Sequence, residues 1–208
     1  MRLGVLGGTF DPIHMGHLII AQEAQQQLAL QKVLFIPTGE PYLRASQPAA
    51  NGRTRLAMVQ LAIKENPAFE ASSMEIDRPG PTYSVETLQA LRDQHSPDTE
   101  LFFILGQDAF MELPSWKSPE MLVSLCTLAV VRRPGAPALE EGGEWSFAGM
   151  KANVVLVRAP LIGISATEIR NRAATGLPMR YWVPLVVENF IKVNRLYGAK
   201  PDPERRVP

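Results

Sequence analysis

The stretch "GGTFDPIHMGHLIIAQEA" (residues 7–24) joins a short apolar run, "RLGVL" (2–6), to a segment whose apolar residues recur at helical spacing. A connection between a strand and a helix usually takes about two to six residues. This one is longer, and it contains paired glycines and two histidines, His14 and His17. We therefore interpret it as a ligand-binding loop between a buried strand and the first helix.

The rest of the chain alternates between strand-like and helix-like segments. Expected strands cover residues 2–6, 32–37, 69–76, 100–106, 127–133 and 153–158; expected helices cover 17–30, 52–66, 84–95, 118–125, 166–174 and 184–196; a Gly/Pro-rich loop is expected over 134–149. This alternation predicts an α/β fold, a doubly wound parallel sheet with helices on both faces, followed by a small C-terminal helical part. Ligands bind such sheets beyond the carboxyl ends of the strands, where the opening loop would lie.

Composition limits the class of protein. The 208 residues predict a single domain, placed at residues 1–198, with a disordered tail over 199–208. Basic and acidic residues number 21 each, which argues against nucleic acid as a partner. The single cysteine, Cys126, excludes an intramolecular disulfide. No apolar stretch reaches the roughly 18 residues of a membrane helix, and the N-terminus does not resemble a signal peptide. We expect a cytoplasmic protein with no membrane partner, and both a monomer and a homo-oligomer fit the sequence.

The opening loop is not one of the common nucleotide-binding motifs. No Gly-Lys-Ser/Thr follows it, so it is not a Walker loop, and Gly4, Gly7 and Gly8 do not form the G-x-G-x-x-G fingerprint of dinucleotide-binding folds. The start of the following helix nevertheless favours an anion, because free backbone N–H groups and the helix dipole point there. The loop is therefore expected to bind phosphate in another way.

Three roles are open for His14 and His17. They could cap the helix or lie on the surface as ordinary polar residues. They could belong to a zinc site, but such a site needs three or four ligands, and Cys126 and His95 do not obviously complete one. Lying one turn apart, both rings can face the same side of the helix. Two ring donors beside a helix N-terminus favour phosphate contact.

The motif "GGTFDPIHMGHL" (7–18) resembles the (H/T)-x-G-H nucleotidyltransferase superfamily. Together with later segments it is similar to the bacterial nicotinate-mononucleotide adenylyltransferases. These segments are "FIPTGEP" (35–41), "GPTYSVETL" (80–88), "LGQDAFMELPSWK" (105–117), "RRPG" (132–135), "ISATEIR" (164–170) and "RLYG" (195–198). The first motif is typical of the whole superfamily, and the later ones narrow the resemblance to the family.

The resemblance implies a Rossmann-like fold and transfer of AMP from Mg-ATP to nicotinate mononucleotide, giving nicotinate adenine dinucleotide and pyrophosphate in NAD biosynthesis. It implies Mg²⁺ held by ATP phosphates and water rather than by protein side chains. The implied catalytic residues are His14, His17 and Arg170. The implied ATP-binding residues are Gly8, Thr9, Phe10, Gly106, Asp108, Arg132, Ile164, Ser165 and Thr167. The implied acceptor-binding residues are Arg44, Ser84, Trp116 and Lys117.

Several of these residues also have purely structural interpretations. Ser165 fits a helix cap with Glu168 as its capping-box partner, and this role is compatible with a ligand contact. Asp108 could cap a short helix, Trp116 could be a core residue, and Arg132 could be a solvated strand-end charge. Ser84 is expected to cap the helix that follows it.

The sequence departs from the family pattern after the second strand. The family usually has Pro-Pro-His-Lys there, whereas this chain has Pro41, Tyr42, Leu43 and Arg44. Arg44 keeps a positive charge with a different geometry. Two alternative functions remain open: the same transfer to nicotinamide mononucleotide or another phosphate acceptor, and a non-catalytic nucleotide-binding module.

Overall fold

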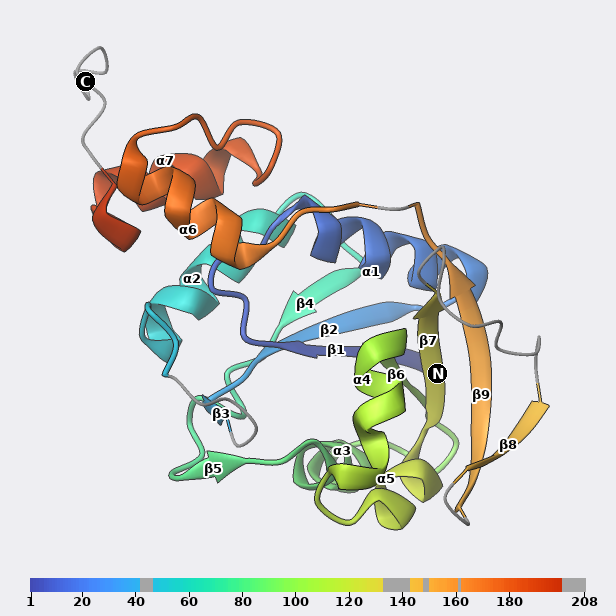
Figure 1. The fold of residues 1–208 in the computed structure, drawn as a ribbon. Coiled ribbons are helices and arrows are strands. Elements are labelled where there is room, and N and C mark those ends of the chain that lie inside the picture. The colour runs from blue at the N-terminus through green and yellow to red at the C-terminus, as the bar shows by residue number, and fades with distance from the viewer. Residues whose placement is uncertain (42–46, 133–142, 148–149, 161, 200–208) are drawn as a thin grey trace.

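A computed structural model describes residues 1–41, 47–132, 143–147, 150–160 and 162–199. In this part of the chain seven strands form one twisted sheet in the order β4-β2-β1-β6-β7-β9-β8 (Figure 1). The strands are β1 (Arg2–Gly8), β2 (Lys32–Pro37), β4 (Phe69–Ala71), β6 (Glu100–Gly106), β7 (Thr127–Arg132), β8 (Gly143–Phe147) and β9 (Met150–Arg158). Neighbouring strands are parallel except β8 and β9, which are antiparallel. No helix among the described residues has the length and apolar character needed to span a bilayer.

The direction of winding reverses between β1 and β6. From β1 the chain builds outward through β2 to β4, then returns to pair β6 against β1, with Leu6 opposite Ile104. The chain then builds the other half through β7 and β9. This arrangement confirms the expected doubly wound sheet, and it creates a switch point at the carboxyl ends of β1 and β6.

Helices cover both faces of the sheet, as predicted. On one face lie α1 (Met15–Gln27), α2 (Gly52–Ile63), α6 (Ala166–Thr175) and α7 (Leu185–Val193), above the sheet in Figure 1. On the other lie α3 (Ser84–Gln94), α4 (Gln107–Glu112) and α5 (Pro119–Leu125). In β6, Phe102 and Ile104 face the first layer and Phe103 faces the second. Because both faces of the sheet are buried under helices, the sequences of its strands are continuous apolar runs.

A second, very short sheet lies outside the main one. β3 (Glu40–Pro41), just after β2, pairs in parallel with β5 (Pro81–Thr82), just before α3 (Figure 1). The pair joins two loops at the carboxyl side of the main sheet.

Two of the expected strand and loop assignments were wrong. The strand expected over 69–76 ends at Ala71, because Ser73 and Asp77 close a turn: the Ser73 hydroxyl donates to the Asp77 carboxylate at 2.6 Å, and the Asp77 N–H donates to the Ser73 carbonyl at 2.9 Å. The loop expected over 134–149 contains strand β8 at the sheet edge. Residues 133–142 and 148–149 of that loop lie outside the described residues.

Helix starts were also displaced. α3 begins at Ser84 itself with Tyr83 in the cap position, so Ser84 does not cap it. Asp108 lies inside the first turn of α4, whose cap position is Gly106, so Asp108 is not a cap either. Ala199, placed in the expected tail, is buried and is the last described residue.

Candidate functional site

The loop after β1 is held tightly against the first helix. Phe10 is buried at positive φ (49°), and its ring packs edge-on against the ring of His17, with centroids 5.0 Å apart. A Cβ on Gly8 would lie 3.1 Å from the Phe10 ring, closer than nearly all such contacts. A side chain at position 8 would therefore force the buried Phe10 ring to shift. Gly8, Thr9 and Phe10 thus lie at the carboxyl end of β1, where they were expected.

His14 and His17 form a stacked pair at the start of α1. Their ring centroids are 3.7 Å apart with planes 25° from parallel, which confirms that both rings face the same side. His14 occupies the cap position, and its backbone N–H donates to Nδ1 of His17 at 3.2 Å. Neutral His17 therefore carries its proton on Nε2. Nδ1 of His14 is buried and has no hydrogen-bond partner among the described residues.

Burial sets the charge of this pair. It lowers the pKa of His14 to about 4, and it lowers the pKa of His17 well below the usual range, with further lowering by the neighbouring His14. Both rings are therefore neutral at pH 7 in the free protein. An anion placed against them would meet N–H donors already stripped of water and would raise both pKa values.

Gly16 leaves the space that the His14 ring fills. A Cβ on Gly16 would lie 3.1 Å from the His14 ring. The space at Gly16 is thus occupied by His14 itself. The preceding Met15 N–H donates to the carbonyl of Trp182 at 2.9 Å, which ties the C-terminal helical part to the start of α1.

Arg170 is brought to the same loop from α6. Its Nη1 donates to the carbonyl of Asp11 at 2.8 Å, and its Nη2 donates to the Thr167 hydroxyl at 3.2 Å. The buried Asp11 carboxylate accepts from the backbone N–H groups of Ala49 (2.7 Å) and Ala50 (3.1 Å). Asp11 thus joins three segments around the loop.

Ser165 caps α6 as predicted, and its hydroxyl accepts from the Glu168 N–H at 3.2 Å. The Glu168 carboxylate instead pairs with Arg172 at 3.2 Å, so the reciprocal half of the expected capping box is replaced by an ion pair. Ile164 lies just before this cap and packs partly against the core.

The remaining ATP-side residues follow neighbouring strands. Gly106 ends β6, and Asp108 is exposed in the first turn of α4, both at the switch point. Arg132 ends β7, at the same edge of the sheet, but its side chain lies outside the described part of the structure. Arg44, with Tyr42 and Leu43, also lies outside the described residues.

The expected acceptor residues lie on the other helical layer. Lys117 Nζ pairs with Glu86 at 2.7 Å and lies 3.9 Å from the centroid of the Tyr83 ring, next to Ser84 at the start of α3. The structure thus brings Ser84 and Lys117 into one corner. Trp116 packs edge-on against Phe103, with centroids 6.2 Å apart, and its buried Nε1 has no hydrogen-bond partner among the described residues.

Sequence reasoning missed two buried charged residues beside these loops, Arg55 and Glu75. Arg55 shares helical spacing with the buried Met58 and Val59, so it lies on the apolar face of α2. A charge on the apolar face of a helix was the available signal. For Glu75, which lies inside the irregular turn between Ser73 and Asp77, no comparable pattern exists.

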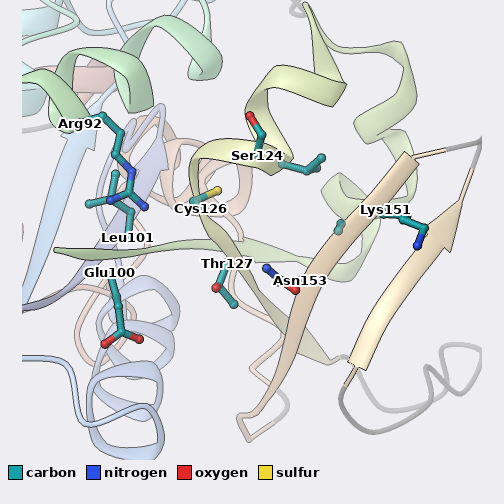
Figure 2. Close-up of a pocket in the computed structure, with 10 residues that line it drawn as sticks. Arg92, Glu100, Leu101, Ser124, Cys126, Thr127, Lys151 and Asn153 are labelled. Atoms are coloured by element: carbon teal, nitrogen blue, oxygen red, sulfur yellow. The ribbon is translucent and has the colours of Figure 1, made fainter. Parts of the chain in front are cut away.

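A separate pocket lies at the opposite edge of the sheet (Figure 2). Its volume is about 290 Å³, and it is bordered by the amino ends of β6, β7 and β9, with Glu100, Thr127 and Asn153 among its lining residues. Its arginine, Arg92, donates from Nε to the Leu125 carbonyl at 2.8 Å. Because parallel sheets bind ligands at carboxyl ends, this pocket is not the candidate site.

Comparisons with known proteins agree with this fold. The cytidylyltransferase-like family model matches residues 5–172. Two solved structures of Plasmodium falciparum nicotinic acid mononucleotide adenylyltransferase share the fold. The complex with APC has a TM-score of 0.76 at 18% identity, and the complex with NaAD has a TM-score of 0.77 at 16% identity; both alignments cover 96% of this chain and 98% of the other.

Sequence relatives are much closer. A protein of Thermomicrobium roseum named "Probable nicotinate-nucleotide adenylyltransferase" is 45% identical over 199 residues, which is 94% of this chain and 91% of the relative. A protein of Thermus thermophilus with the same name is 45% identical over 197 residues, covering 95% of this chain and 100% of the relative. The chain therefore belongs to the cytidylyltransferase-like family and, within it, to the nicotinate-nucleotide adenylyltransferases.

Proposed function

We propose that this chain transfers AMP from ATP to the phosphate of nicotinate mononucleotide, yielding nicotinate adenine dinucleotide and pyrophosphate in NAD biosynthesis. The observation that carries the proposal is the stacked, desolvated pair His14 and His17 at the switch point, beside the N-terminus of α1. The names of relatives at 45% identity over nearly the whole chain support the same reaction.

The chemistry needs little from the protein beyond placement and charge. A phosphate oxygen of the acceptor forms a bond to the α-phosphorus of ATP, and the bond from that phosphorus to the bridging oxygen of pyrophosphate breaks. A phosphate monoester is already anionic at neutral pH, so its oxygen attacks without a general base. Catalysis therefore depends on bringing two polyanions into line and on stabilising charge on the leaving group.

The phosphate end of the site is suited to this task. His17 would donate its Nε2–H to the ATP phosphates, and His14, stacked on it, would supply a second ring donor. Arg170 would add a fixed positive charge, because the carbonyl of Asp11 and the hydroxyl of Thr167 hold its guanidinium in place. Thr167 would therefore act on the phosphates mainly through Arg170.

The other proposed contacts surround this end. Backbone groups of the loop after β1 would contact the nucleotide, and residues at the start of α4 would contact the ribose. The acceptor would bind at the start of α3, with the Trp116 ring beside the nicotinate. The ATP-side residues are Gly8, Thr9, Phe10, Gly106, Asp108, Arg132, Ile164 and Ser165; the acceptor-side residues are Arg44, Ser84, Trp116 and Lys117.

We further propose that Mg²⁺ enters with ATP. With nucleotide substrates this ion is commonly held by the phosphates and by water, with few protein ligands. Bound in that way, the ion neutralises charge on the phosphates of ATP.

Pyrophosphate release by the purified protein tests the proposal, with Mg-ATP and either nicotinate mononucleotide, nicotinamide mononucleotide or no acceptor. We expect rapid release with the nicotinate compound and little with the other two. Equal rates with both mononucleotides would keep the reaction and remove the carboxylate-selective role of Ser84, Trp116 and Lys117. No pyrophosphate release with either acceptor would contradict the proposal and favour another phosphate acceptor or a non-catalytic nucleotide-binding module.

A further inference from the structure

A buried polar network runs beneath both substrate regions, from Arg55 in α2 to Thr87 in α3. Gly39, in the loop after β2, lies between its two arms. We propose that Arg55 and Glu75 are positioning residues that hold the Gly39 peptide between them, and so fix the ATP-binding loop relative to the acceptor-binding wall. The inference rests on the proposed function, because it assigns the two ends of the network to the two substrates.

The first arm is the guanidinium of Arg55, whose residue is only 1% exposed. Its Nε donates to the carbonyl of Ala50 at 3.1 Å, and Nη1 donates to the carbonyl of Thr9 at 2.7 Å. Its Nη2 donates to the carbonyls of Thr38 at 2.7 Å and Gly39 at 3.3 Å. One planar group thus joins the loop after β1, the loop after β2 and the start of α2. Lysine cannot reproduce such a fork, because its donors sit on a single atom.

The second arm is the carboxylate of Glu75, which is buried. The Thr87 hydroxyl donates to its Oε1 at 2.7 Å. Burial raises the pKa of Glu75, while the Thr87 and Thr82 hydroxyls, Arg78 and the backbone N–H of Gly39 lower it, in that order. The carboxylate therefore faces polar groups from three segments: the loop after β2, β5 and α3.

Gly39 is the point where the arms meet, and the fit there is close. A Cβ at this position would overlap the backbone carbonyl of Glu75, so glycine is required. The next residues are joined to β5, with Glu40 opposite Pro81, and the Thr82 hydroxyl donates to the Glu40 carbonyl at 3.2 Å. The loop after β2 is thus bound to the segment that leads into Ser84.

The two arms predict different kinetic effects. Arg55 contacts the ATP-side loop at Thr9 as well as Gly39, so a change at Arg55 should weaken the binding of both substrates. The Thr87 hydroxyl donates to Glu75 and accepts from Arg78 Nη1 at 3.4 Å, both on the acceptor side of the network, so a change there should alter acceptor binding rather than ATP binding. A residue that merely stabilised the fold would not separate the two substrates in this way.

Thr87→Val and Thr87→Ser form the matched pair for the test, since serine keeps the hydroxyl and valine removes it. Calorimetric titration with nicotinate mononucleotide and with ATP gives a Kd for each, and steady-state assays give kcat. We expect Thr87→Val to weaken acceptor binding about fivefold, the equivalent of one hydrogen bond, with an unchanged Kd for ATP and with Thr87→Ser at the parent value. Arg55→Lys should weaken binding of both compounds and lower kcat at least about tenfold through misplacement of the substrates.

Thr87→Val with both Kd values unchanged, or with both raised equally, would overturn the proposal. Should Arg55→Lys fail to fold, Glu75→Gln takes its place and must weaken acceptor binding more than ATP binding. Because binding is measured separately from turnover, a parent protein that binds both compounds without releasing pyrophosphate would contradict the proposed function and leave this comparison intact. A parent that binds neither compound would overturn both.

Discussion

The histidines of the phosphate end and the lysine of the acceptor wall are in opposite states. At the phosphate end, His14 and His17 are stacked and desolvated, burial lowers both pKa values, and Nδ1 of His14 has no hydrogen-bond partner among the described residues. At the acceptor wall, Lys117 is already paired with Glu86 and lies over the ring of Tyr83.

This difference follows from what each half has to do. Charge develops on the phosphates during the reaction, and donors that are dry and poorly satisfied beforehand gain most when it appears. The nicotinate carboxylate of the acceptor keeps the same charge throughout the reaction, so its wall can be organised by internal pairs. Substitutions at the phosphate end should therefore have the larger effect on activity, and the desolvated groups there should lower the stability of the fold. Substitutions at the acceptor wall should have only small effects on either.

Removing the His17 ring should produce the largest effect on activity. His17→Ala deletes the Nε2–H donor while leaving α1 in place, and we expect kcat to fall by roughly 10²–10³, the usual cost of one such donor. Pyrophosphate release at saturating substrates measures it. His95→Ala is the matched control, because His95 ends α3 away from the switch point and should leave kcat unchanged. A His17→Ala protein within a few-fold of the parent would contradict the proposed role.

The desolvated pair should also make the fold sensitive to acid. Burial lowers the pKa of His14 to about 4, whereas an unfolded histidine binds its proton near 6.5. The unfolded state thus binds more protons between these values, and the free energy of unfolding falls as pH drops through that window. The loss for His14 is about 3 kcal/mol by the linkage relation.

Chemical denaturation at a series of pH values from 7 to 4 measures this loss. His14→Gln has no titrating ring at this position and should lose less stability over the same range than the parent, while the buried His17 still titrates in both proteins. Acidic groups elsewhere titrate equally in both proteins, so the difference between the two curves reports the His14 ring together with its contribution to the lowered pKa of His17. Parallel curves would show that His14 is not desolvated.

Local sequence patterns predicted the parts of the molecule that depend on local chemistry. Alternation of apolar runs and helical segments predicted a sheet wound on both faces, and the cap signal at Ser165 was confirmed by the hydrogen bond that its hydroxyl accepts from the Glu168 N–H. The spacing of His14 and His17 was sufficient to place both rings on one side.

Features set by tertiary contacts were not predictable in the same way. Nothing near Lys117 in sequence indicates that Glu86, on another helix, neutralises it. The role of Gly16 depends on where the His14 ring turns back, and strand β8 depends on pairing with β9. Arg55 was visible on an apolar helical face, but its carbonyl partners come from loops distant in sequence.

The cap of α6 offers an internal contrast at the phosphate end, because the Ser165 hydroxyl already accepts a hydrogen bond there. Ser165→Ala should cost about 1 kcal/mol of stability through loss of the cap to the Glu168 N–H, which lowers the Tm by about 2–4 °C in a domain of this size. Ser165→Gly should cost only a few tenths of a kcal/mol. Thermal unfolding distinguishes them, and equal losses would show that the cap is not what Ser165 contributes.

The smallest effect is expected at Lys117, and it addresses the acceptor wall most directly. Both Lys117 and Glu86 are partly exposed, so their pair is worth no more than about 1 kcal/mol. Lys117→Met should change the KM for nicotinate mononucleotide less than about fivefold and leave kcat unchanged. Glu86→Gln should raise the preference for nicotinate over nicotinamide mononucleotide. With Glu86 replaced by an uncharged residue, Lys117 becomes available to the nicotinate carboxylate. A fall in that preference would mean that Glu86 orients Lys117 toward the substrate, and the acceptor wall would then resemble the phosphate end in keeping a donor ready for its ligand.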